Sequence, residues 1–467
     1  MGVANFVVKP LGLAFGLLWN ALDGLVTKVC GKQADAVDGP LTKFLLDYRW
    51  VLVLFIVLPL SKLFDLYWCV RNWVFRTFLS APHEHEKRVQ AIIEQMRQWD
   101  ASGRHGLLHT NRPGWAQMST RVAWYKDGRK ANAIDIDLYD ILEVDTERRI
   151  VRAEPLVNVG QLSKRLVGMG WTIPIMPEMD DLTLSGLLLG YGIEGSSHKY
   201  GLFCDIIKSV DVITGDLQVV HCSATENADL FHALPWSYGA LGFVVALEIE
   251  IVPVKPFVRV TYLPCHTKDD FVAAFQEAST GPNPPEFVEA VLFEPQRGVI
   301  VTGDYCDTAD VEWSKKNAIG WWFKPWFYKH IQSFLQYRAP QVEYIPVREY
   351  YHRHNRSIFW EGELIFPIGT HTWFRYLLGW LMPPKVSFLR LTEGELVRKF
   401  YEDRHVVQEA LVPTAQMSEY LTMFHETFEC YPLWMCPHKM MRTEPRGYMY
   451  PKDGMGMLAL VISLSIS

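Results

Sequence analysis

The 467-residue sequence lacks an excess of positive charge and lacks any ordered arrangement of cysteine. Lysine and arginine number 46 against 52 aspartate and glutamate residues, so the net charge is −6 and no basic surface for nucleic acid is indicated. The eight cysteines are scattered without a CxxC pair, which argues against a disulfide framework or a structural zinc site. What remains is a globular protein of a thiol-reducing compartment, long enough for two large domains.

Two common phosphate-binding motifs are also missing. No GxxxxGK[ST] sequence occurs, which excludes a P-loop, and no GxGxxG follows a predicted strand. The Gly-Tyr-Gly sequence at 190–192 is a fragment of the second motif and is weak alone. A nucleotide cofactor would therefore need another kind of loop.

The N-terminal region has no uninterrupted apolar run of the roughly 20 residues that a membrane span needs. Trp50–Leu60 has only eleven residues, and Lys62 and Asp65 follow it. Arginine, tryptophan and tyrosine at both ends are typical of interfacial anchors. We expect a membrane anchor within residues 1–80, as a short span or an interfacial helix pair, with a buried helix as the alternative. The flanking charges are balanced and leave its orientation open.

Aromatic residues are abundant, with 17 Trp, 20 Tyr and 25 Phe, which suits a large apolar ligand or a membrane-facing surface. Periodicity predicts a helix in 81–103 and a mixture of helices and strands after it. The predicted elements are strands at 132–138 and 149–155, a helix at 158–170, a hairpin at 207–223 turning at Gly215 and Asp216, a helix at 226–235 and a strand at 247–253. We predict an α+β domain over residues 81–254 and a second domain over 255–467.

Residues 176–201, MPEMDDLTLSGLLLGYGIEGSSHKYG, place five glycines among their last sixteen positions. A surface loop is one interpretation, but the leucines of this stretch predict burial, and buried amide groups need partners. A bound phosphate would serve several amides at once. Together with TNRPGWAQMS at 110–119, the stretch could hold a flavin diphosphate between two loops without a Rossmann fold.

Several long segments resemble a known family. RPGW at 112–115, with the segments 140–162 and 170–186, resembles the FAD-binding (PCMH-type) domain of the vanillyl-alcohol-oxidase superfamily. GSSHKYGLF at 195–203, the segment 226–253 and YYHRHNRSIFWE at 350–361 narrow this to the Δ24-sterol reductase (diminuto/dwarf) family. The resemblance extends from about Trp50 to about Pro451.

The resemblance implies an α+β fold in which a two-subdomain PCMH-type FAD-binding domain is followed by an α+β substrate (cap) domain and preceded by a membrane anchor. It implies reduction of the Δ24 side-chain double bond of sterols, of the desmosterol-to-cholesterol type, with FAD and NADPH. The implied partners are a sterol and a membrane, and the implied location is the endoplasmic reticulum membrane. A Golgi location and a homo-oligomer stay open.

The resemblance also assigns the FAD contacts. Trp115 stands where many oxidases of the superfamily carry a histidine bonded to the flavin, so non-covalent FAD is expected. Asp181 is expected to orient the loop and not to face phosphate. The implied FAD-binding residues are Arg112, Gly114, Trp115, Thr183, Leu184, Ser185, Gly186, Leu187, Leu188, Leu189, Gly190, Tyr191, Gly192, Ile193, Glu194, Gly195, Ser196 and Ser197.

Reduction of an isolated alkene requires a hydride, a proton donor and a dry pocket. Tyr351 and Glu361 are weak candidates for the acid. Arg353 and Arg356 are candidates for contacts to cofactor phosphate, whereas the pair His352 and His354 has no acidic or cysteine neighbour at metal-ligand spacing. The candidates for a sterol slot are Trp321, Trp322, Trp326, Phe327 and Phe359.

The last residues, MLALVISLSIS at 457–467, depart from the family, which continues differently after GYMYPKDG. This end resembles an alternative or truncated terminus. We expect it to form a strand, on β-propensity alone, or to insert at a membrane surface. It leaves open a catalytically impaired form that binds a sterol or a partner, and the shared flavin domain leaves open a flavin oxidase of a small alcohol or hydroxy acid.

Overall fold

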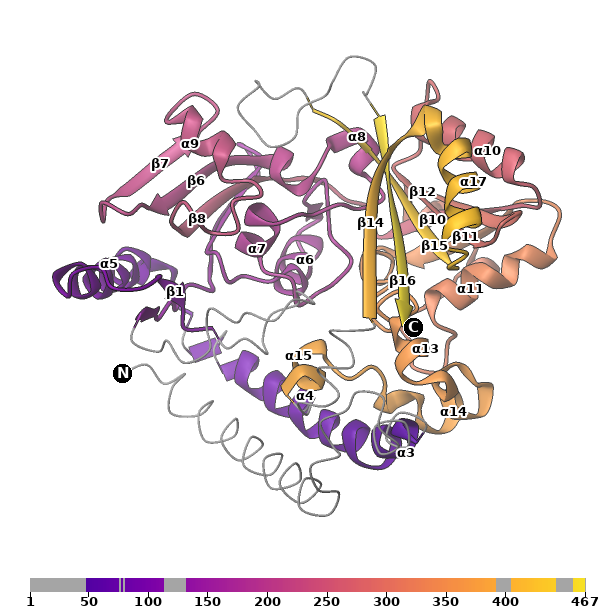
Figure 1. Ribbon diagram of the computed structural model, residues 1–467, viewed down its shortest axis with the longest axis horizontal. Helices are drawn as coiled ribbons and strands as arrows, with labels where there is room; N and C mark the ends of the chain where they lie inside the picture. Colours follow the sequence, from indigo (N-terminus) through magenta and orange to yellow (C-terminus); the bar gives the residue numbers. More distant parts are fainter. Residues whose placement is uncertain are drawn as a thin grey trace.

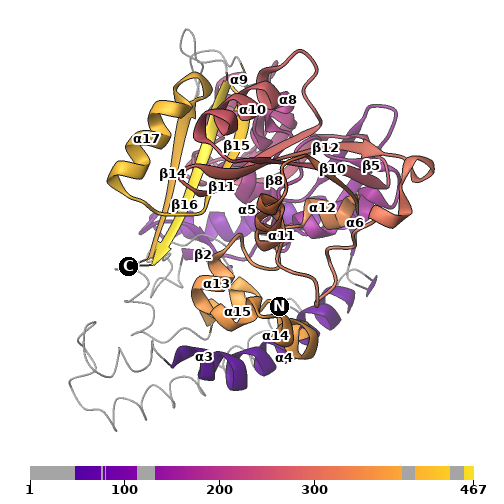
Figure 2. The same ribbon diagram turned by 90° about the vertical axis from the view of Figure 1, so that its right-hand side faces the viewer.

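The computed structural model describes residues 48–74, 77–78, 80–112, 132–391, 405–441 and 457–466. Two β-sheets lie side by side in this part of the chain, with helices packed on them and a long N-terminal helix below (Figure 1). Figure 2 shows the same helix at the lower edge of the molecule after a quarter turn. The mixed α and β composition agrees with the predicted fold class.

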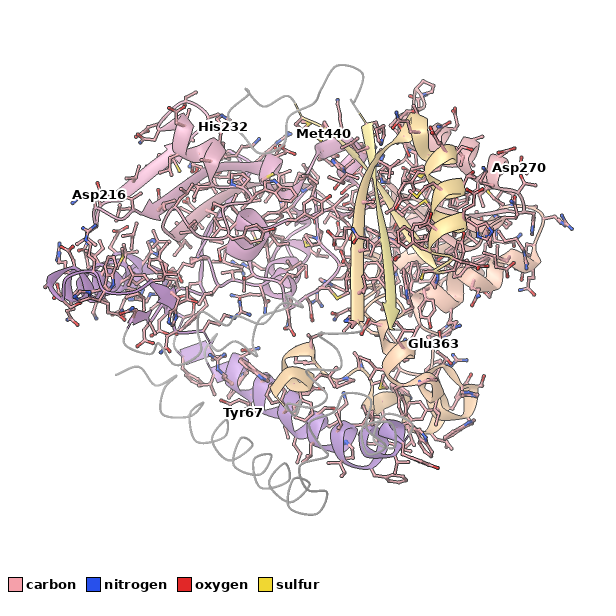
Figure 3. The ribbon with its side chains drawn as sticks, viewed as in Figure 1. Tyr67, Asp216, His232, Asp270, Glu363 and Met440 are labelled. Carbon is pink, nitrogen blue, oxygen red and sulfur yellow. The ribbon has the colours of Figure 1, made fainter. Side chains whose placement is uncertain are left out.

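The first sheet has five antiparallel strands in the order β3-β4-β8-β6-β7. Asp216 lies at the tip of the β6–β7 hairpin (Figure 3). The strands are β3 (Ile141–Asp145), β4 (Ile150–Ala153), β6 (Ile207–Ile213), β7 (Val219–Ser223) and β8 (Phe243–Glu250). The helices around them are α5 (His85–Ala101), α6 (Val159–Val167), α7 (Leu184–Leu189), α8 (Ser197–Tyr200) and α9 (Ala228–Ala233). Two short pairs complete this half: β1 (His109–Thr110) with β2 (Ala133–Ile134), and β5 (Trp171–Thr172) with β9 (Val252–Pro253).

The second sheet has seven antiparallel strands in the order β13-β10-β12-β11-β15-β16-β14. They are β10 (Phe257–Cys265), β11 (Phe287–Glu294), β12 (Arg297–Cys306), β13 (Gln341–Pro346), β14 (His405–Pro413), β15 (Leu433–Lys439) and β16 (Met457–Ile466). Helices α10 (Lys268–Thr280) and α17 (Met417–Thr427) cover one face through a separate apolar cluster (Figure 1). The other face meets the first half of the molecule.

Shorter helices connect these layers. They are α11 (Phe327–Ser333), α12 (Val347–Tyr351), α13 (Glu361–Ile365), α14 (Thr372–Leu378) and α15 (Val386–Leu391). Turns of 3₁₀ helix occur at η4 (Pro82–Glu84), η8 (Phe203–Ile206), η9 (Thr308–Asp310), η10 (Trp313–Lys315), η11 (Phe334–Gln336), η12 (Pro367–Thr370), η13 (Gly379–Leu381) and η14 (Thr414–Gln416).

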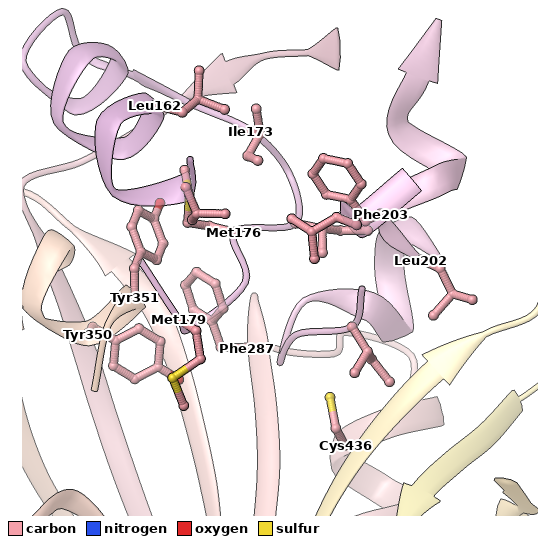
Figure 4. Packing of buried hydrophobic residues seen from close by; sticks show 14 of the residues in the cluster. Leu162, Ile173, Met176, Met179, Leu202, Phe203, Phe287, Tyr350, Tyr351 and Cys436 are labelled. Carbon is pink, nitrogen blue, oxygen red and sulfur yellow. The ribbon is translucent and has the colours of Figure 1, made fainter. Parts of the chain in front are cut away.

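The largest core joins the two halves of the chain. Figure 4 shows Leu162 and Phe203 from the first half close to Phe287 and Tyr351 from the second. All four side chains are almost completely buried. The seven-stranded sheet supplies this core because alternate residues of a strand face opposite sides of the sheet. Phe287 of β11 therefore points to the shared core, while Val288 joins the cluster under α10 and α17.

The N-terminal helix is longer than the apolar run in the sequence. It comprises α3 (Arg49–Leu52), a π-helical turn η2 (Val53–Val57) and α4 (Leu58–Val74). Lys62 and Asp65 do not end it, because they form an ion pair of 2.9 Å along the helix. Among the described residues, one segment, Val53–Val74, is long and apolar enough to cross a membrane. This agrees with the predicted N-terminal anchor.

Most predicted elements are confirmed, with differences at their ends. The helices expected in 81–103 and 158–170 are α5 and α6, and the 207–223 hairpin is β6–β7. The strand expected at 132–138 is reduced to Ala133–Ile134, and the strand expected at 247–253 begins earlier, at Phe243. The C-terminal stretch forms β16, which pairs with β14 on one side and β15 on the other, so the predicted strand is confirmed.

Candidate functional site

The glycine-rich segment 183–201 lies at the meeting of the two halves of the molecule. It is not one continuous loop, because α7 and α8 form within it. The amides of Leu184 and Ser185 donate to the carbonyls of Val157 and Pro155 at 3.0 and 3.1 Å, which fixes the start of α7. Leu184, Leu187 and Leu188 are buried, so the predicted burial of this segment is confirmed.

Two of its glycines allow close approach of neighbouring chain. A Cβ atom on Gly192 would lie 2.7 Å from the Cβ atom of Phe203, which is too close for real atoms. A Cβ on Gly195 would lie 3.3 Å from the carbonyl oxygen of Val288, whose amide donates to Gly195 at 2.8 Å. The missing side chains thus bring the segment against η8 and β11. Their predicted contact with a ligand stays a prediction.

The stretch between α7 and α8 has the donors that a bound diphosphate requires. None of the hydrogen bonds among the described residues uses the amides of Tyr191, Gly192 or Ile193, although Gly192 and Ile193 are buried. The buried hydroxyl of Tyr191 also has no partner within this part of the chain, and its ring packs on Trp236 at 4.9 Å. Buried amides without a partner can donate to a bound anion. These residues therefore fit a phosphate-bearing cofactor.

The predicted FAD contacts outside the 191–193 stretch are not alike in their surroundings. Gly114 and Trp115 lie outside the described residues. Burial lowers the pKa of Arg112, and nearby Asp181 opposes that effect. The Asp181 carboxylate binds Lys385 at 2.8 Å, so it ties the loop to α15. Ser196 is another of the expected FAD contacts, and its hydroxyl donates to the Pro174 carbonyl at 2.8 Å.

Next to this segment lies a buried cluster of charged groups that the sequence did not reveal. Arg353 donates to Glu194 at 2.6 Å and to Glu289 at 2.7 Å, and all three side chains are almost fully buried. Glu289 also receives the Trp434 indole N–H at 2.7 Å and faces His354 Nε2 at 3.0 Å. Burial alone would raise the pKa of Glu289, but Arg353 and His354 outweigh it and hold that pKa below its usual range.

Glu178 and Glu194 form a pair of carboxyl groups at the edge of this cluster. The Glu178 carboxyl lies near that of Glu194, whose Oε2 receives no bond from a described N–H or hydroxyl group. Burial and then the charge of Glu194 raise the pKa of Glu178 to about 8. A proton on Glu178 would offer a donor near Glu194 Oε2. Glu178 is half-buried, and its raised pKa favours the protonated form at neutral pH.

Sequence reasoning missed this cluster because its members come from distant elements. Glu178 precedes α7, Glu289 lies on β11 and Arg353 follows α12. One signal was available: Glu194 is the only charged residue between Leu182 and Ser197. A lone carboxylate in a buried, uncharged segment needs a cation or a proton.

The two predicted acids do not join the cluster as direct partners. The Tyr351 hydroxyl pairs with that of Tyr305 at 2.6 Å, and burial raises its pKa further from neutrality. Glu361 pairs with His405 of β14 at 3.0 Å. His352 and His354 also diverge, since His352 Nε2 lies 2.9 Å from the Ser163 hydroxyl while His354 faces Glu289.

The two arginines proposed for cofactor phosphate have protein partners. Arg353 is enclosed by its two carboxylates, and Arg356 donates to the carbonyls of Ile319, Trp322 and Lys324. The structure therefore corrects that expectation. The aromatic candidates also separate, because Trp326, Phe327 and Phe359 are buried while Trp321 and Trp322 are exposed.

The turn that follows Arg353 connects the cluster with a small apolar cavity of about 30 Å³. His354 stacks on Phe359 at 4.3 Å, and its carbonyl accepts from the amide of Ile358 at 2.8 Å. Ile358 has φ of +48°, unusual for a β-branched residue and a mark of strain. The cavity is lined by Val53, Arg356, Ser357, Ile358, Gly362, Ile365, Phe366, Met382, Pro383, Pro384 and Leu389.

Comparison with known proteins identifies both the cofactor domain and the family. The FAD binding domain family matches residues 118–223, which include the segment 183–201. The Delta(24)-sterol reductase of Rattus norvegicus is 48% identical over 408 residues, covering 87% of this chain and 78% of the relative. This chain belongs to the Δ24-sterol reductase family. The Arabidopsis thaliana member is 42% identical over 427 residues, covering 88% of this chain and 75% of that protein. A Delta(24)-sterol reductase homolog of Caenorhabditis elegans is 41% identical over 400 residues, covering 84% and 76%.

Proposed function

We propose that this protein reduces the Δ24 side-chain double bond of sterol intermediates, with non-covalent FAD as cofactor and NADPH as electron donor. The observation that carries the proposal is the match to Δ24-sterol reductases along 87% of the chain. When bound, the flavin supplies the hydride chemistry. The protein must bind the cofactor and the sterol, exclude water and supply a proton.

The Glu178–Glu194 pair is our candidate for the source of that proton. An acid is useful when its pKa lies near the working pH, because it is then protonated and still able to release its proton. The pKa of about 8 for Glu178 meets this condition. Arg353 holds the Glu194 side chain in place, and the raised pKa makes Glu178 our choice for the member of the pair that carries the proton. Tyr351 meets the condition less well, because its pKa is raised further above neutrality.

The same geometry supports our choice of residues for FAD and the sterol. The free amides of Tyr191, Gly192 and Ile193 would receive the diphosphate. The turn at 354–359 has the charged cluster on one side and the apolar cavity on the other. This arrangement suits an apolar sterol, whose double bond must come close to the proton that we place on Glu178. The cavity is too small for a sterol as it stands, so its lining would have to open.

The test uses the full chain in microsomes from a host without its own Δ24-reductase. With desmosterol and NADPH we expect cholesterol, detected by mass spectrometry, and we expect flavin absorbance that denaturation releases from the protein. Glu178→Gln should lower turnover while the bound flavin stays at the normal level.

Other outcomes would replace the proposal. Hydrogen peroxide released without NADPH would indicate a flavin oxidase. Sterol binding without any product would indicate a binding protein. Flavin that stays attached to the denatured chain would contradict non-covalent FAD. Normal turnover of Glu178→Gln would mean that another residue donates the proton, and it would leave the proposed reaction unchanged.

A further inference from the structure

The N-terminal helix is covered along one side by helices of the second half of the molecule. Leu58 is completely buried against Phe366, Phe374 and Leu381, and the ring of Phe64 lies 5.1 Å from that of Phe388. Figures 1 and 2 both place α4 below α15 and beside α14. The helix is therefore attached lengthwise and does not project from the molecule.

The opposite side of this helix is an exposed apolar stripe. Its members are three, four or eight residues apart, so they share one helical face. They are Phe55, Leu63, Leu66, Val70 and Trp73, exposed by 70, 60, 61, 50 and 58%. Lys62 and Asp65 lie beside the stripe and neutralise each other in their ion pair.

A second exposed stripe runs along α14 and η13, which packs against α4. Trp373, Tyr376, Leu377 and Trp380 repeat at helical spacing and are 52 to 68% exposed. The Trp321–Phe323 segment extends it, because Phe323 stacks on Tyr376 at 5.7 Å and its carbonyl accepts from Arg375 at 2.8 Å. We call the two stripes together with Trp321 and Trp322 the basal apolar surface.

We infer that the basal apolar surface rests in one leaflet of a lipid bilayer, with α4 in the plane of the membrane and α14–η13 inserted beside it. The surface continues from the one described segment that is apolar enough for a membrane. Its Trp and Tyr rings, apolar with one polar group, are typical of the membrane–water interface. An exposed apolar surface of this extent needs a partner.

A crossing orientation of α4 conflicts with its packing. The helix would carry α13, α14 and α15 into the hydrocarbon, together with Glu361 of α13 and the Lys385–Asp181 ion pair. Charged groups are costly there. An amphipathic helix lying in the interface buries only its apolar face and leaves the charged groups in water. Figure 3 shows Tyr67 on α4 and Glu363 on α13 at this end of the molecule.

The depth of single positions in vesicles tests the inference. An environment-sensitive fluorescent amino acid is introduced genetically at Leu63, at Leu377 or, as control, at the exposed Met423 of α17, which lies away from this surface. The full chain is reconstituted in phosphatidylcholine–phosphatidylserine vesicles. We expect probes at 63 and 377 to be quenched by lipids with a nitroxide near the headgroup and protected from iodide, whereas the probe at 423 is quenched by iodide only.

Three results would overturn the inference. Stronger quenching at position 63 by a nitroxide near the acyl-chain end would mean that α4 crosses the bilayer. Quenching at 377 by iodide alone would leave α14 in water. Protection at 377 that persists in detergent, together with cross-linked dimers, would assign the surface to a second copy of this chain.

A pair of double variants provides an independent check. Leu377→Asp/Trp380→Asp should increase the share of protein that alkaline carbonate removes from microsomes. Met423→Asp/Phe428→Asp carries the same charge on exposed apolar positions of the α17 region and should leave that share unchanged. Equal extraction of both variants and the unmodified protein would contradict a role of α14–η13 in membrane contact.

Discussion

At the scale of single residues, the decisive group is Arg353, because it makes a buried set of carboxylates possible. The carboxyl groups of Glu194 and Glu289 both accept hydrogen bonds from its guanidinium. A buried carboxylate without such a partner is costly and takes up a proton instead. Glu178 has no such ion pair among the described residues, and its pKa is raised. Burial and the charge of Glu194 therefore raise the pKa of Glu178 above its usual range.

The raised pKa of Glu178 predicts a dependence of stability on pH. Between the ordinary glutamate pKa of 4.5 and about 8, folded Glu178 keeps a proton that the unfolded chain has lost. Stability should therefore fall as pH rises through this range, and the full cost remains above it. Glu178→Gln replaces the titrating carboxyl with a neutral amide. It should therefore raise the free energy of unfolding above pH 8 by at least about 1 kcal/mol, since one pKa unit corresponds to roughly 1.4 kcal/mol.

Thermal unfolding between pH 5 and pH 9 measures the effect, with Glu147→Gln on an exposed turn as control. The control should keep the pH dependence of the unmodified protein. If Glu178→Gln also keeps it, the proton does not reside on Glu178. The turnover of the unmodified enzyme should decline above about pH 8 for the same reason, and that decline should be absent from the variant.

At the scale of elements, the segment from α7 to α8 shows why glycine occurs where it does. Gly192 lies against Phe203, whose amide donates to the Gly192 carbonyl at 2.9 Å. This contact sets the direction of the chain between the two helices and leaves the neighbouring amides free. Packing and ligand binding thus depend on the same absent side chain.

Gly192→Ala should therefore destabilise the fold and reduce its FAD content. The added Cβ would lie 2.7 Å from that of Phe203, and overpacking of this kind costs about 1–3 kcal/mol. Gly215→Ala at the β6–β7 turn is a matched control, because nothing lies within 4 Å of its added Cβ. Urea unfolding and the ratio of flavin to protein absorbance measure both effects. Equal stability and equal FAD content of the two variants would show that the 190–194 stretch can accommodate a Cβ at position 192.

At the scale of the whole molecule, one core holds the FAD-binding half and the second half together. Phe203 is fully buried in it with Phe287 of β11 (Figure 4). The basal apolar surface and the apolar cavity belong to the same assembly, since Val53 of the N-terminal helix lines the cavity. A sterol dissolved in the membrane would thus begin close to the turn that bears His354.

The shared core predicts that the two sheets unfold together. Phe203→Ala should lower the free energy of unfolding by about 3–5 kcal/mol, as for other buried aromatic truncations. It should also weaken hydrogen-exchange protection in β12, although that strand belongs to the other sheet. Phe428→Ala, at a side chain that is 58% exposed, should change stability by no more than about 0.5 kcal/mol. Unchanged protection of β12 in Phe203→Ala would mean that the sheets unfold independently.

The sequence by itself determined the features that depend on local pattern or on long motifs. The period of apolar residues fixed α5 and the β6–β7 hairpin, and the β-prone C-terminal residues fixed β16. The motifs at 195–203 and 226–253 identified the family. The burial of 183–201 followed from its leucines, because apolar side chains leave water wherever the chain permits.

Only the tertiary structure decided which distant groups meet. Arg353 was expected to face phosphate, but the fold encloses it between Glu194 and Glu289, from two other elements. Glu178 carries no local signal, and its proton depends on the neighbouring charge and on burial. The position of α4 was also undecided, since its apolar composition suits a span, a buried helix or an interfacial helix equally. Its packing against α14 and α15 is what favours the interfacial arrangement that we infer, because solvation free energy depends on surroundings that side chains acquire only when the chain has folded.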